Sequence, residues 1–182
     1  MPTPDWKKKT KREAWYIGDT YNLSIGQGDL LVTPLQLTRA IASIANNGQL
    51  LTPRLVKSSF SPLTGQKDYP VRVDKDDVAP ESVLRLVREG MRQAVLTGSA
   101  RTFATLPVEV AAKTGTAQFD KQKEKTHSWL TAFAPYDKPQ IAVTVIVEGG
   151  GEGYAVASPV AKNIIEAYFK LPLTPIQPLP ND

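Results

Sequence analysis

A Lys-Thr-Gly-Thr segment, Lys113 to Thr116, is the sharpest candidate for chemistry in this sequence. On a strand that borders a cleft, the Lys113 ammonium would attract a substrate carboxylate and favour a negatively charged transition state. The hydroxyls of Thr114 and Thr116 could donate hydrogen bonds to the same carboxylate. Gly115 has no side chain, so a peptide could pair with the strand edge, and the Thr116 N–H could serve as an oxyanion donor. The alternative interpretation of these four residues is an exposed polar strand with one lysine.

Other catalytic arrangements find little support in the composition. The sequence has no cysteine and a single histidine, His127, which excludes disulfides, iron–sulfur clusters and zinc sites built from several histidines within it. A Ser-His-Asp triad would need His127, and no G-x-S-x-G turn accompanies it. Covalent catalysis would therefore use another base, for which lysine is the obvious candidate. We expect His127 and Trp129 to pack within a strand, the alternative being a position beside the cleft.

Two glycine-rich segments lack the context of a nucleotide site. The segment Gly26 to Leu31 begins like G-x-G-x-x-G but ends in leucine, and no apolar strand precedes it. We expect its glycines to let the backbone turn tightly behind the cleft. The segment 148–153 carries two glutamates that would repel phosphate, and no Gly-Lys-Ser/Thr follows.

The charge pattern does not indicate a nucleic-acid partner. The formal net charge is only +4, which is mild for a protein of this size. A basic run at 7–12 is flanked by aromatic residues such as Trp6 and Trp15, and it could contact nucleic acid or lipid headgroups. We expect instead a solvated surface segment that its aromatic side chains hold in place. No apolar stretch approaches the roughly 20 residues that span a bilayer.

Two helices are predicted before the Lys-Thr-Gly-Thr segment. The first should run over 34–46, because Thr33 can cap its start and residues 46–48 tolerate the left-handed geometry that ends a helix. The second should run over 80–96, where apolar residues recur on one face. Residues 49–79 should form short extended pieces and turns.

Three strands are predicted in the second half of the sequence, at 108–118, 128–134 and 141–147. A charged connection at 120–125 should separate the first two, and a proline-containing turn at 135–139 should separate the last two. Successive strands with short connections favour an antiparallel meander.

A last helix and a proline-rich tail are predicted to follow. Ser158 can cap the helix, and Pro159 suits its first position. The tail, residues 171–182, should be extended or disordered. The predicted fold class is therefore α+β, an antiparallel sheet packed with helices.

A long series of motifs resembles the class B penicillin-binding proteins, especially their elongation-specific, rod-shape type. The matching segments are Pro4–Lys7, Trp15–Asn22, Ile25–Gly28, Val32–Leu37, Ile44–Gly48, Lys113–Gln118 and Thr131–Tyr136. In that family a K-T-G motif acts together with S-x-x-K and S-x-N motifs. The resemblance covers nearly the whole sequence apart from the tail and the region 55–80.

This resemblance implies that residues 1–170 are the C-terminal part of a penicillin-binding transpeptidase domain, with part of the penicillin-binding/β-lactamase-like fold. The implied reaction is D,D-transpeptidation of peptidoglycan, in which a serine attacks the penultimate D-Ala carbonyl of a stem peptide. The implied catalytic-site residues are Lys113, Thr114, Gly115 and Thr116. The implied substrate-binding residues are Lys113, Thr114, Thr116 and Ala117. No metal and no organic cofactor is needed.

The resemblance also implies partners and a location. The partners are stem peptides ending in D-Ala-D-Ala, β-lactams that mimic them, the N-terminal half of the same protein and the rod-shape elongation machinery. The location is the outer, periplasmic face of the cytoplasmic membrane.

The sequence contains no Ser-x-x-Lys and no Ser-x-Asn, both of which lie upstream in the family. We therefore expect these 182 residues alone to be inactive and poorly folded. Two alternatives remain. One is a β-lactamase or β-lactam-sensing domain, against which the match over 15–48 argues. The other is a non-catalytic module that binds wall peptides or a partner.

Overall fold

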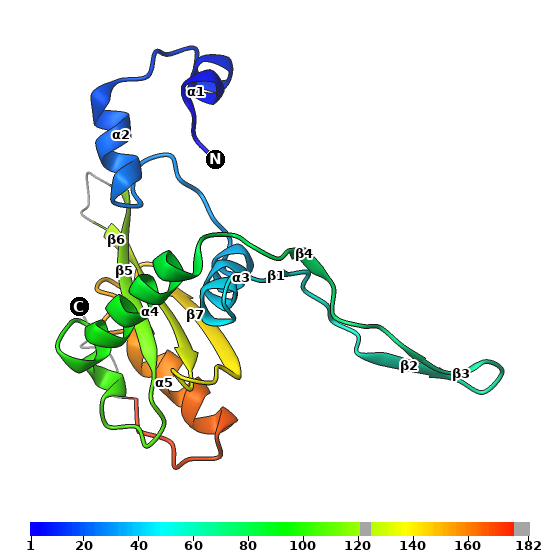
Figure 1. Cartoon of the computed structure of the whole chain (residues 1–182). Coiled ribbons are helices and arrows are strands. Elements are labelled where there is room, and N and C mark those ends of the chain that lie inside the picture. Colours follow the sequence, from blue (N-terminus) through cyan, green and yellow to red (C-terminus); the bar gives the residue numbers. More distant parts are fainter. Residues whose placement is uncertain (121–124, 177–182) are drawn as a thin grey trace.

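The computed structural model describes residues 1–120 and 125–176. Its centre is an antiparallel sheet in the order β5-β6-β7, built from Ala111–Asp120, Lys125–Ala134 and Ile141–Val147 (Figure 1). The predicted meander is therefore confirmed. β6 begins at Lys125, earlier than predicted, and most of the predicted charged connection (121–124) lies outside the described residues.

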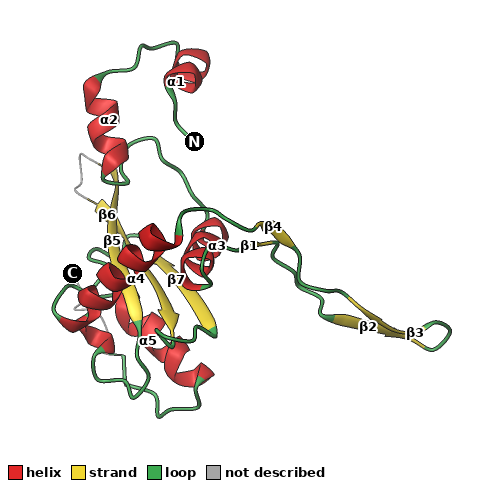
Figure 2. Ribbon diagram, viewed as in Figure 1, coloured by secondary structure: helices red, strands yellow, loops and turns green. Residues whose placement is uncertain are grey.

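Helices cover both faces of this sheet (Figure 2). α3 (Pro34–Ala45) packs on one face of β6 and β7, α5 (Ala157–Tyr168) packs on the other, and α4 (Glu81–Leu96) runs beside β5. Side chains alternate between the faces of a strand, so Phe133 belongs to the core beneath α3 while Leu130 belongs to the core beneath α5. This arrangement confirms the α+β prediction.

α3 begins and ends where the sequence predicts. Thr33 Oγ1 accepts a hydrogen bond from the Gln36 N–H, and the Gln36 side chain accepts one from the Thr33 N–H, which completes a capping box. Asn47 and Gly48 follow with positive φ angles of 63° and 103°. α4 likewise starts directly after Pro80, and a short 3-10 helix, Arg101–Phe103, follows it.

α5 starts differently from the prediction. The helix begins at Ala157 with Val156 as its N-cap, so the prediction that Ser158 caps it is wrong. Ser158 is buried within the first turn, and its hydroxyl donates to the Gly153 carbonyl at 3.0 Å. The Ala157 N–H donates instead to the Ser128 hydroxyl of β6 at 3.0 Å. A contact with the sheet, and not a local cap, therefore fixes the start of this helix.

The N-terminal region contains two short helices that the sequence analysis did not predict, α1 (Pro4–Lys11) and α2 (Ile17–Ser24). They stand beyond one end of the sheet, where the turn after α2 approaches β5 (Figure 1). The prediction of a solvated basic segment holds for Lys8 and Lys9, which are exposed. It is wrong for Lys7, which is only 5% exposed.

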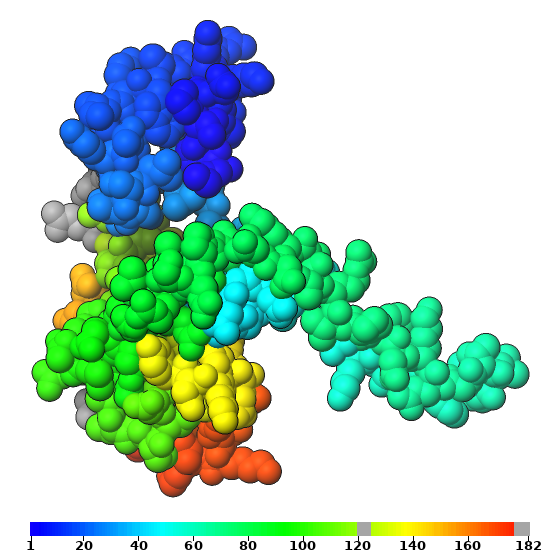
Figure 3. All heavy atoms as spheres, in the orientation of Figure 1, coloured from blue at the N-terminus to red at the C-terminus, as the bar shows by residue number. Residues whose placement is uncertain are grey.

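Residues 49–79 leave the body of the molecule as a narrow arm (Figure 3). Within it, β1 (Leu50–Leu51) pairs with β4 (Val73–Lys75), and β2 (Ser58–Ser61) pairs with β3 (Gly65–Asp68), both antiparallel. This arrangement agrees with the short extended pieces and turns that were predicted.

The start of the tail, 171–176, has no helix or strand and is tied to α5. The Thr174 N–H and hydroxyl donate to the two carboxylate oxygens of Glu166 at 2.8 and 2.6 Å. Glu166 is only 2% exposed, and burial alone would raise its pKa. The hydrogen bonds from Thr174 and the charge of Lys162 outweigh burial and hold the pKa of Glu166 below its usual value. None of the helices in the described ranges is long and apolar enough to cross a bilayer.

Candidate active site

The Lys-Thr-Gly-Thr segment lies in the middle of β5, which is an edge strand of the described sheet. Lys113 is paired with Thr131 and faces the α3 and α4 side. Its ammonium is exposed and donates to the Thr114 carbonyl at 2.6 Å. Because side chains alternate, Thr114 and Thr116 project toward the opposite, α5 side.

Both threonine hydroxyls have protein partners. Thr114 Oγ1 lies 2.6 Å from Ser99 Oγ, in the turn after α4. Thr116 Oγ1 donates to the carboxylate of Glu152 at 2.9 Å. A hydroxyl donates only one hydrogen, so Thr116 would have to turn away from Glu152 to bind a ligand carboxylate. Neither Ser99 nor Glu152 is among the site residues predicted from the sequence.

The outer edge of β5 is defined by its hydrogen-bonding pattern. The Thr116 carbonyl and the Gln118 N–H bind the side chain of Gln27, so these residues direct their backbone groups away from β6. Alternation along an antiparallel strand places the backbone groups of Thr114 on the same open side. The Thr116 N–H therefore points outward, in the direction that an oxyanion donor requires.

An open, apolar cavity of about 540 Å³ lies beside Lys113. Its apolar walls come from α3, α4 and the sheet, through Leu37, Ile41, Ile44, Val87, Met91 and Trp129. Lys113, Thr114 and Gly115 form its margin with β5. The arrangement resembles a ligand site, where apolar walls surround a few polar groups, and it also leaves part of the α3 face uncovered.

The glycine-rich segment 148–153 packs against the paired strands β5 and β6. A Cβ atom on Gly153 would lie 2.4 Å from the Gly115 carbonyl oxygen and 2.5 Å from the Trp129 carbonyl oxygen. Only glycine fits so close to two backbones. This close approach holds Glu152 beside Thr116.

His127 and Trp129 take different positions. The His127 ring stacks on Phe119 with 4.0 Å between ring centroids, and its Nδ1 accepts from the Gly149 N–H at 3.1 Å. The prediction of strand packing is therefore right for His127. Trp129 instead lines the cavity beside Lys113, which was the alternative.

The sequence of residues 3–166 matches the family described as penicillin binding protein transpeptidase domain. The chain belongs to this family. This match confirms the resemblance to the penicillin-binding transpeptidases that was found in the sequence. The similar structures described next confirm the fold that this resemblance implied.

Among the relatives in this transpeptidase family is the peptidoglycan D,D-transpeptidase MrdA of Haemophilus influenzae. It is 33% identical over 193 aligned positions, which cover 97% of this chain and 30% of the relative. The crystal structure of Pseudomonas aeruginosa PBP2 is 37% identical with a TM-score of 0.73, covering 92% of this chain and 37% of that one. Helicobacter pylori PBP2 in complex with MreC is 32% identical with a TM-score of 0.73, covering 93% of this chain and 30% of that one. The chain thus spans about 30% of the length of the curated relative.

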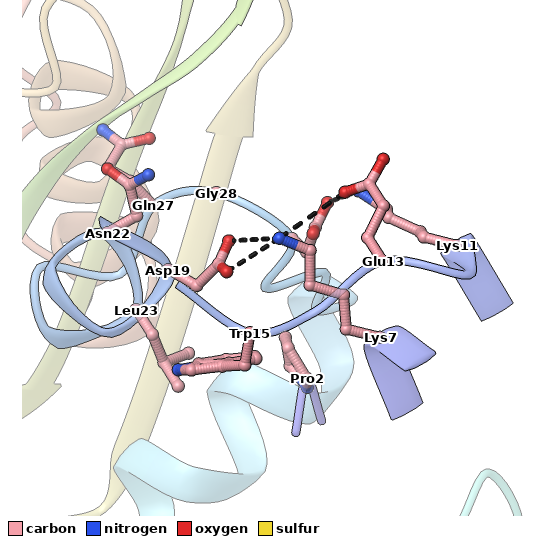
Figure 4. Close-up of a pocket in the computed structure, with 11 residues that line it drawn as sticks. Pro2, Lys7, Lys11, Glu13, Trp15, Asp19, Asn22, Leu23, Gln27 and Gly28 are labelled. Atoms are coloured by element: carbon pink, nitrogen blue, oxygen red, sulfur yellow. Dashed lines mark hydrogen bonds and ion pairs between the residues drawn. The ribbon is translucent and has the colours of Figure 1, made fainter. Parts of the chain in front are cut away.

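A second, polar pocket of about 220 Å³ lies between α1, α2 and the turn after α2 (Figure 4). Its charged side chains are paired: Lys7 Nζ lies 2.7 Å from Asp19 and 3.6 Å from Glu13, and Lys11 Nζ lies 2.5 Å from Asp29. The hydrogen bond between Lys7 and Asp19 raises the pKa of Lys7 and lowers that of Asp19.

We interpret this pocket as a polar packing contact between the two N-terminal helices, because each of its charged side chains has a partner of opposite charge. In residues 1–120 and 125–176, no group of three His, Cys, Asp or Glu side chains is positioned to hold a metal ion.

Proposed function

We propose that this chain carries the Lys-Thr-Gly strand of a serine-type peptidoglycan D,D-transpeptidase, an enzyme that cross-links stem peptides in the cell wall. One observation carries the proposal: the Lys113 cation lies on an edge strand, between an outward-facing backbone edge and an apolar cavity. A stem peptide needs these same features, namely a cation for its terminal carboxylate and a strand edge for its backbone. Membership of the penicillin-binding transpeptidase family supports the reaction class.

Each residue of the segment has a proposed role. Lys113, whose ammonium reaches the outer edge of β5 at the Thr114 carbonyl, binds the terminal carboxylate. Thr114 and Thr116 join it across this edge, for which their hydroxyls must turn away from Ser99 and Glu152. Ala117 contributes to the substrate surface. The Thr116 N–H donates to the oxyanion. Gly115 keeps the strand edge accessible, and a Cβ there would lie 3.2 Å from Trp129 Cβ.

The proposed reaction has two steps. A serine hydroxyl attacks the carbonyl of the penultimate D-Ala and forms an ester. The peptide bond to the terminal D-Ala breaks, the nitrogen of that residue receives the serine proton, and free D-Ala leaves. An amine of a second stem peptide then attacks the resulting ester and releases the serine. β-Lactams would acylate the same serine because they mimic D-Ala-D-Ala.

The serine must come from outside this sequence, which contains no Ser-x-x-Lys. We propose that residues 1–170 act with the N-terminal half of the same domain, and that this half packs into the cavity between α3, α4 and β5. Residues 171–182 form a separate tail. We propose that the enzyme works at the periplasmic face of the cytoplasmic membrane with the rod-shape machinery. A protein partner is supported by the similar Helicobacter pylori PBP2, which forms a complex with MreC.

A second candidate function is a non-catalytic module that binds wall peptides or a partner. The absence of Ser-x-x-Lys from the sequence favours it for these residues alone. Covalent labelling by penicillin separates these two candidates, because a transpeptidase forms an acyl-enzyme and a non-catalytic module does not.

The direct test is the rate at which a fluorescent penicillin acylates the full-length protein. Lys113→Ala should slow acylation about a hundredfold, because loss of one charge-assisted contact to a transition state typically costs about 3 kcal/mol. Thr116→Ser should have a far smaller effect, because the hydroxyl and the N–H both remain. Lys138→Ala removes an exposed lysine between β6 and β7 and serves as the matched control. A loss of less than about threefold in Lys113→Ala would assign Lys113 to the surface and reject the proposed site.

A further inference from the structure

The turn Gly26-Gln27-Gly28 after α2 reaches the outer edge of β5. Gln27 Nε2 donates to the Thr116 carbonyl at 3.0 Å, and Gln27 Oε1 accepts from the Gln118 N–H at 3.3 Å. The two contacts join residues 89 and 91 positions apart. One carboxamide therefore binds an acceptor and the next outward donor of β5, as a peptide group of a neighbouring strand would.

The backbone holds Gln27 in this position. Gly26 and Gly28 have positive φ angles of 74° and 77°, which glycine adopts readily. A Cβ on Gly28 would lie 3.1 Å from Asn22 Cβ. The Gln27 N–H donates to the Asn22 carbonyl at 2.9 Å, so the turn is tied to the last part of α2. The tight turn expected from the sequence thus delivers the Gln27 side chain to β5.

We propose that Gln27 is a positioning residue of the active site, a proposal that rests on the transpeptidase function proposed above. By binding the Thr116 carbonyl, Gln27 fixes the residue whose N–H would hold the oxyanion. Because Gln27 accepts a hydrogen bond from the Gln118 N–H, a peptide bound along β5 cannot extend its backbone hydrogen bonds as far as Gln118. An extended peptide would then pair with Thr114 and Thr116 and no further. The Thr116 carbonyl has two lone pairs, so it can accept from Gln27 and from the peptide together.

A purely structural tie between α2 and β5 would behave differently. Loss of such a tie would lower the stability of the protein and would leave the acylation rate of the folded protein unchanged. Loss of a positioning contact would slow acylation while the protein remains folded. The test therefore needs a measure of the chemistry, a measure of stability and a measure of the contact itself.

The experiment uses the full-length protein and the second-order rate of acylation by a fluorescent penicillin. Gln27→Ala should slow acylation about tenfold, because it removes two neutral hydrogen bonds that each typically contribute a factor of about two to ten. The Gln118 amide should exchange with deuterium faster in this variant, while the amides of β5 that face β6 stay protected. Gln49→Ala is the matched control, because Gln49 binds Asp76 where the arm of residues 49–79 begins and ends, away from β5. It should leave the acylation rate unchanged.

Gln27→Glu tests positioning within one folded variant. Near neutral pH its carboxylate cannot donate to the Thr116 carbonyl, so acylation should be slow. The protonated carboxyl group can donate to that carbonyl and accept from the Gln118 N–H. A glutamate ordinarily titrates near pH 4.3, and the neighbouring carbonyl favours the protonated form. The ratio of variant to wild-type rates should therefore rise severalfold as the pH falls from about 7 to about 5.

Three results would overturn the proposal. They are acylation of Gln27→Ala within about twofold of wild type, a rate loss explained wholly by unfolding in a thermal melt, and a Gln27→Glu ratio that does not change with pH. If wild type itself is not acylated, the proposed function fails and the positioning role fails with it. Deuterium exchange at Gln118 would then still report whether Gln27 binds the strand, so the two failures are distinguishable.

Discussion

Replacing Gly153 by alanine tests how closely the 148–153 segment and β5 depend on each other. The new Cβ would lie 2.4 Å from the Gly115 carbonyl oxygen, whereas real Cβ atoms essentially never approach closer than 3.0 Å. The segment and the strand must therefore separate by at least about 0.6 Å. Neither neighbour is a flexible side chain, because both close contacts are backbone oxygens of paired strands.

Two measurements on the full-length protein follow from this separation. Overpacking typically costs about 1–3 kcal/mol, and two rigid neighbours place this case near the upper value. The unit that unfolds is the whole domain, about twice residues 1–170, and its unfolding entropy is about 2.1 cal/mol/K per residue, so a cost of about 3 kcal/mol lowers the melting midpoint by about 4 °C. Misplacing catalytic groups by about 1 Å can cost a hundredfold in rate, so acylation by penicillin should fall at least about tenfold.

The control for this prediction is Gly18→Ala. Gly18 lies in α2 with a helical backbone, and a Cβ atom added there would meet no atom within 4 Å, so its replacement should be neutral or slightly stabilising. The reasoning is refuted if Gly153→Ala melts within about 2 °C of wild type and acylates at the wild-type rate.

The remaining predictions concern the tail and these residues on their own. Because the pKa of Glu166 is lowered in the folded state, its contribution to stability is present above its ordinary pKa and is lost as the pH falls through the lowered value. Thr174→Val should raise the pKa of Glu166 and lower the free energy of unfolding by about 1 kcal/mol, so that acid unfolding, monitored by circular dichroism, begins at a higher pH. Thr174→Ser keeps the hydroxyl and should behave like wild type. Equal acid midpoints for Thr174→Val and wild type would contradict the role of Thr174. Residues 1–182 alone should gain no penicillin mass, and a stoichiometric adduct on any serine would disprove the external nucleophile. Residues 1–182 alone should also melt without cooperativity. Each leucine or isoleucine left uncovered loses about 1.5–3 kcal/mol of burial free energy, and the net stability of a domain is only about 5–15 kcal/mol. A sharp melt from a clean monomer would contradict this prediction.

Elements set by local chemistry could be predicted from the sequence. The capping box at Thr33, the left-handed residues after α3 and the three successive strands depend on neighbours a few positions away. The Lys-Thr-Gly-Thr segment could also be assigned to a strand, because the apolar pattern around it is local. These locally determined elements were therefore sufficient to predict the fold class.

The contacts of the candidate site could not be predicted in the same way. Glu152 reaches Thr116 across 36 positions, and Gln27 reaches it across 89. The residue types near Thr116 do not indicate which polar side chain from a distant part of the sequence will contact it. The predicted start of α5 was wrong for a related reason. Ser158 is a residue type that often caps a helix, but the Ala157 N–H at the start of α5 donates to the Ser128 hydroxyl of β6 instead. The one available signal was the Gly-Gln-Gly pattern, because two glycines around a polar residue indicate a backbone shaped to present that residue.

The contacts around β5 restrict the directions from which a nucleophile could approach a substrate bound beside Lys113. One edge of the strand is occupied by β6, and the face bearing Thr116 is covered by Glu152 and Gly153. Gln27 occupies the outer edge beyond Thr116. Among the described residues, this leaves the outer edge at Thr114 to Thr116 and the apolar cavity on the α3 and α4 side. If the proposed function holds, a peptide would take the outer edge, and the serine would have to approach from the cavity. The apolar walls of that cavity would then be buried by the same segment that brings the nucleophile, which couples completion of the core to completion of the active site.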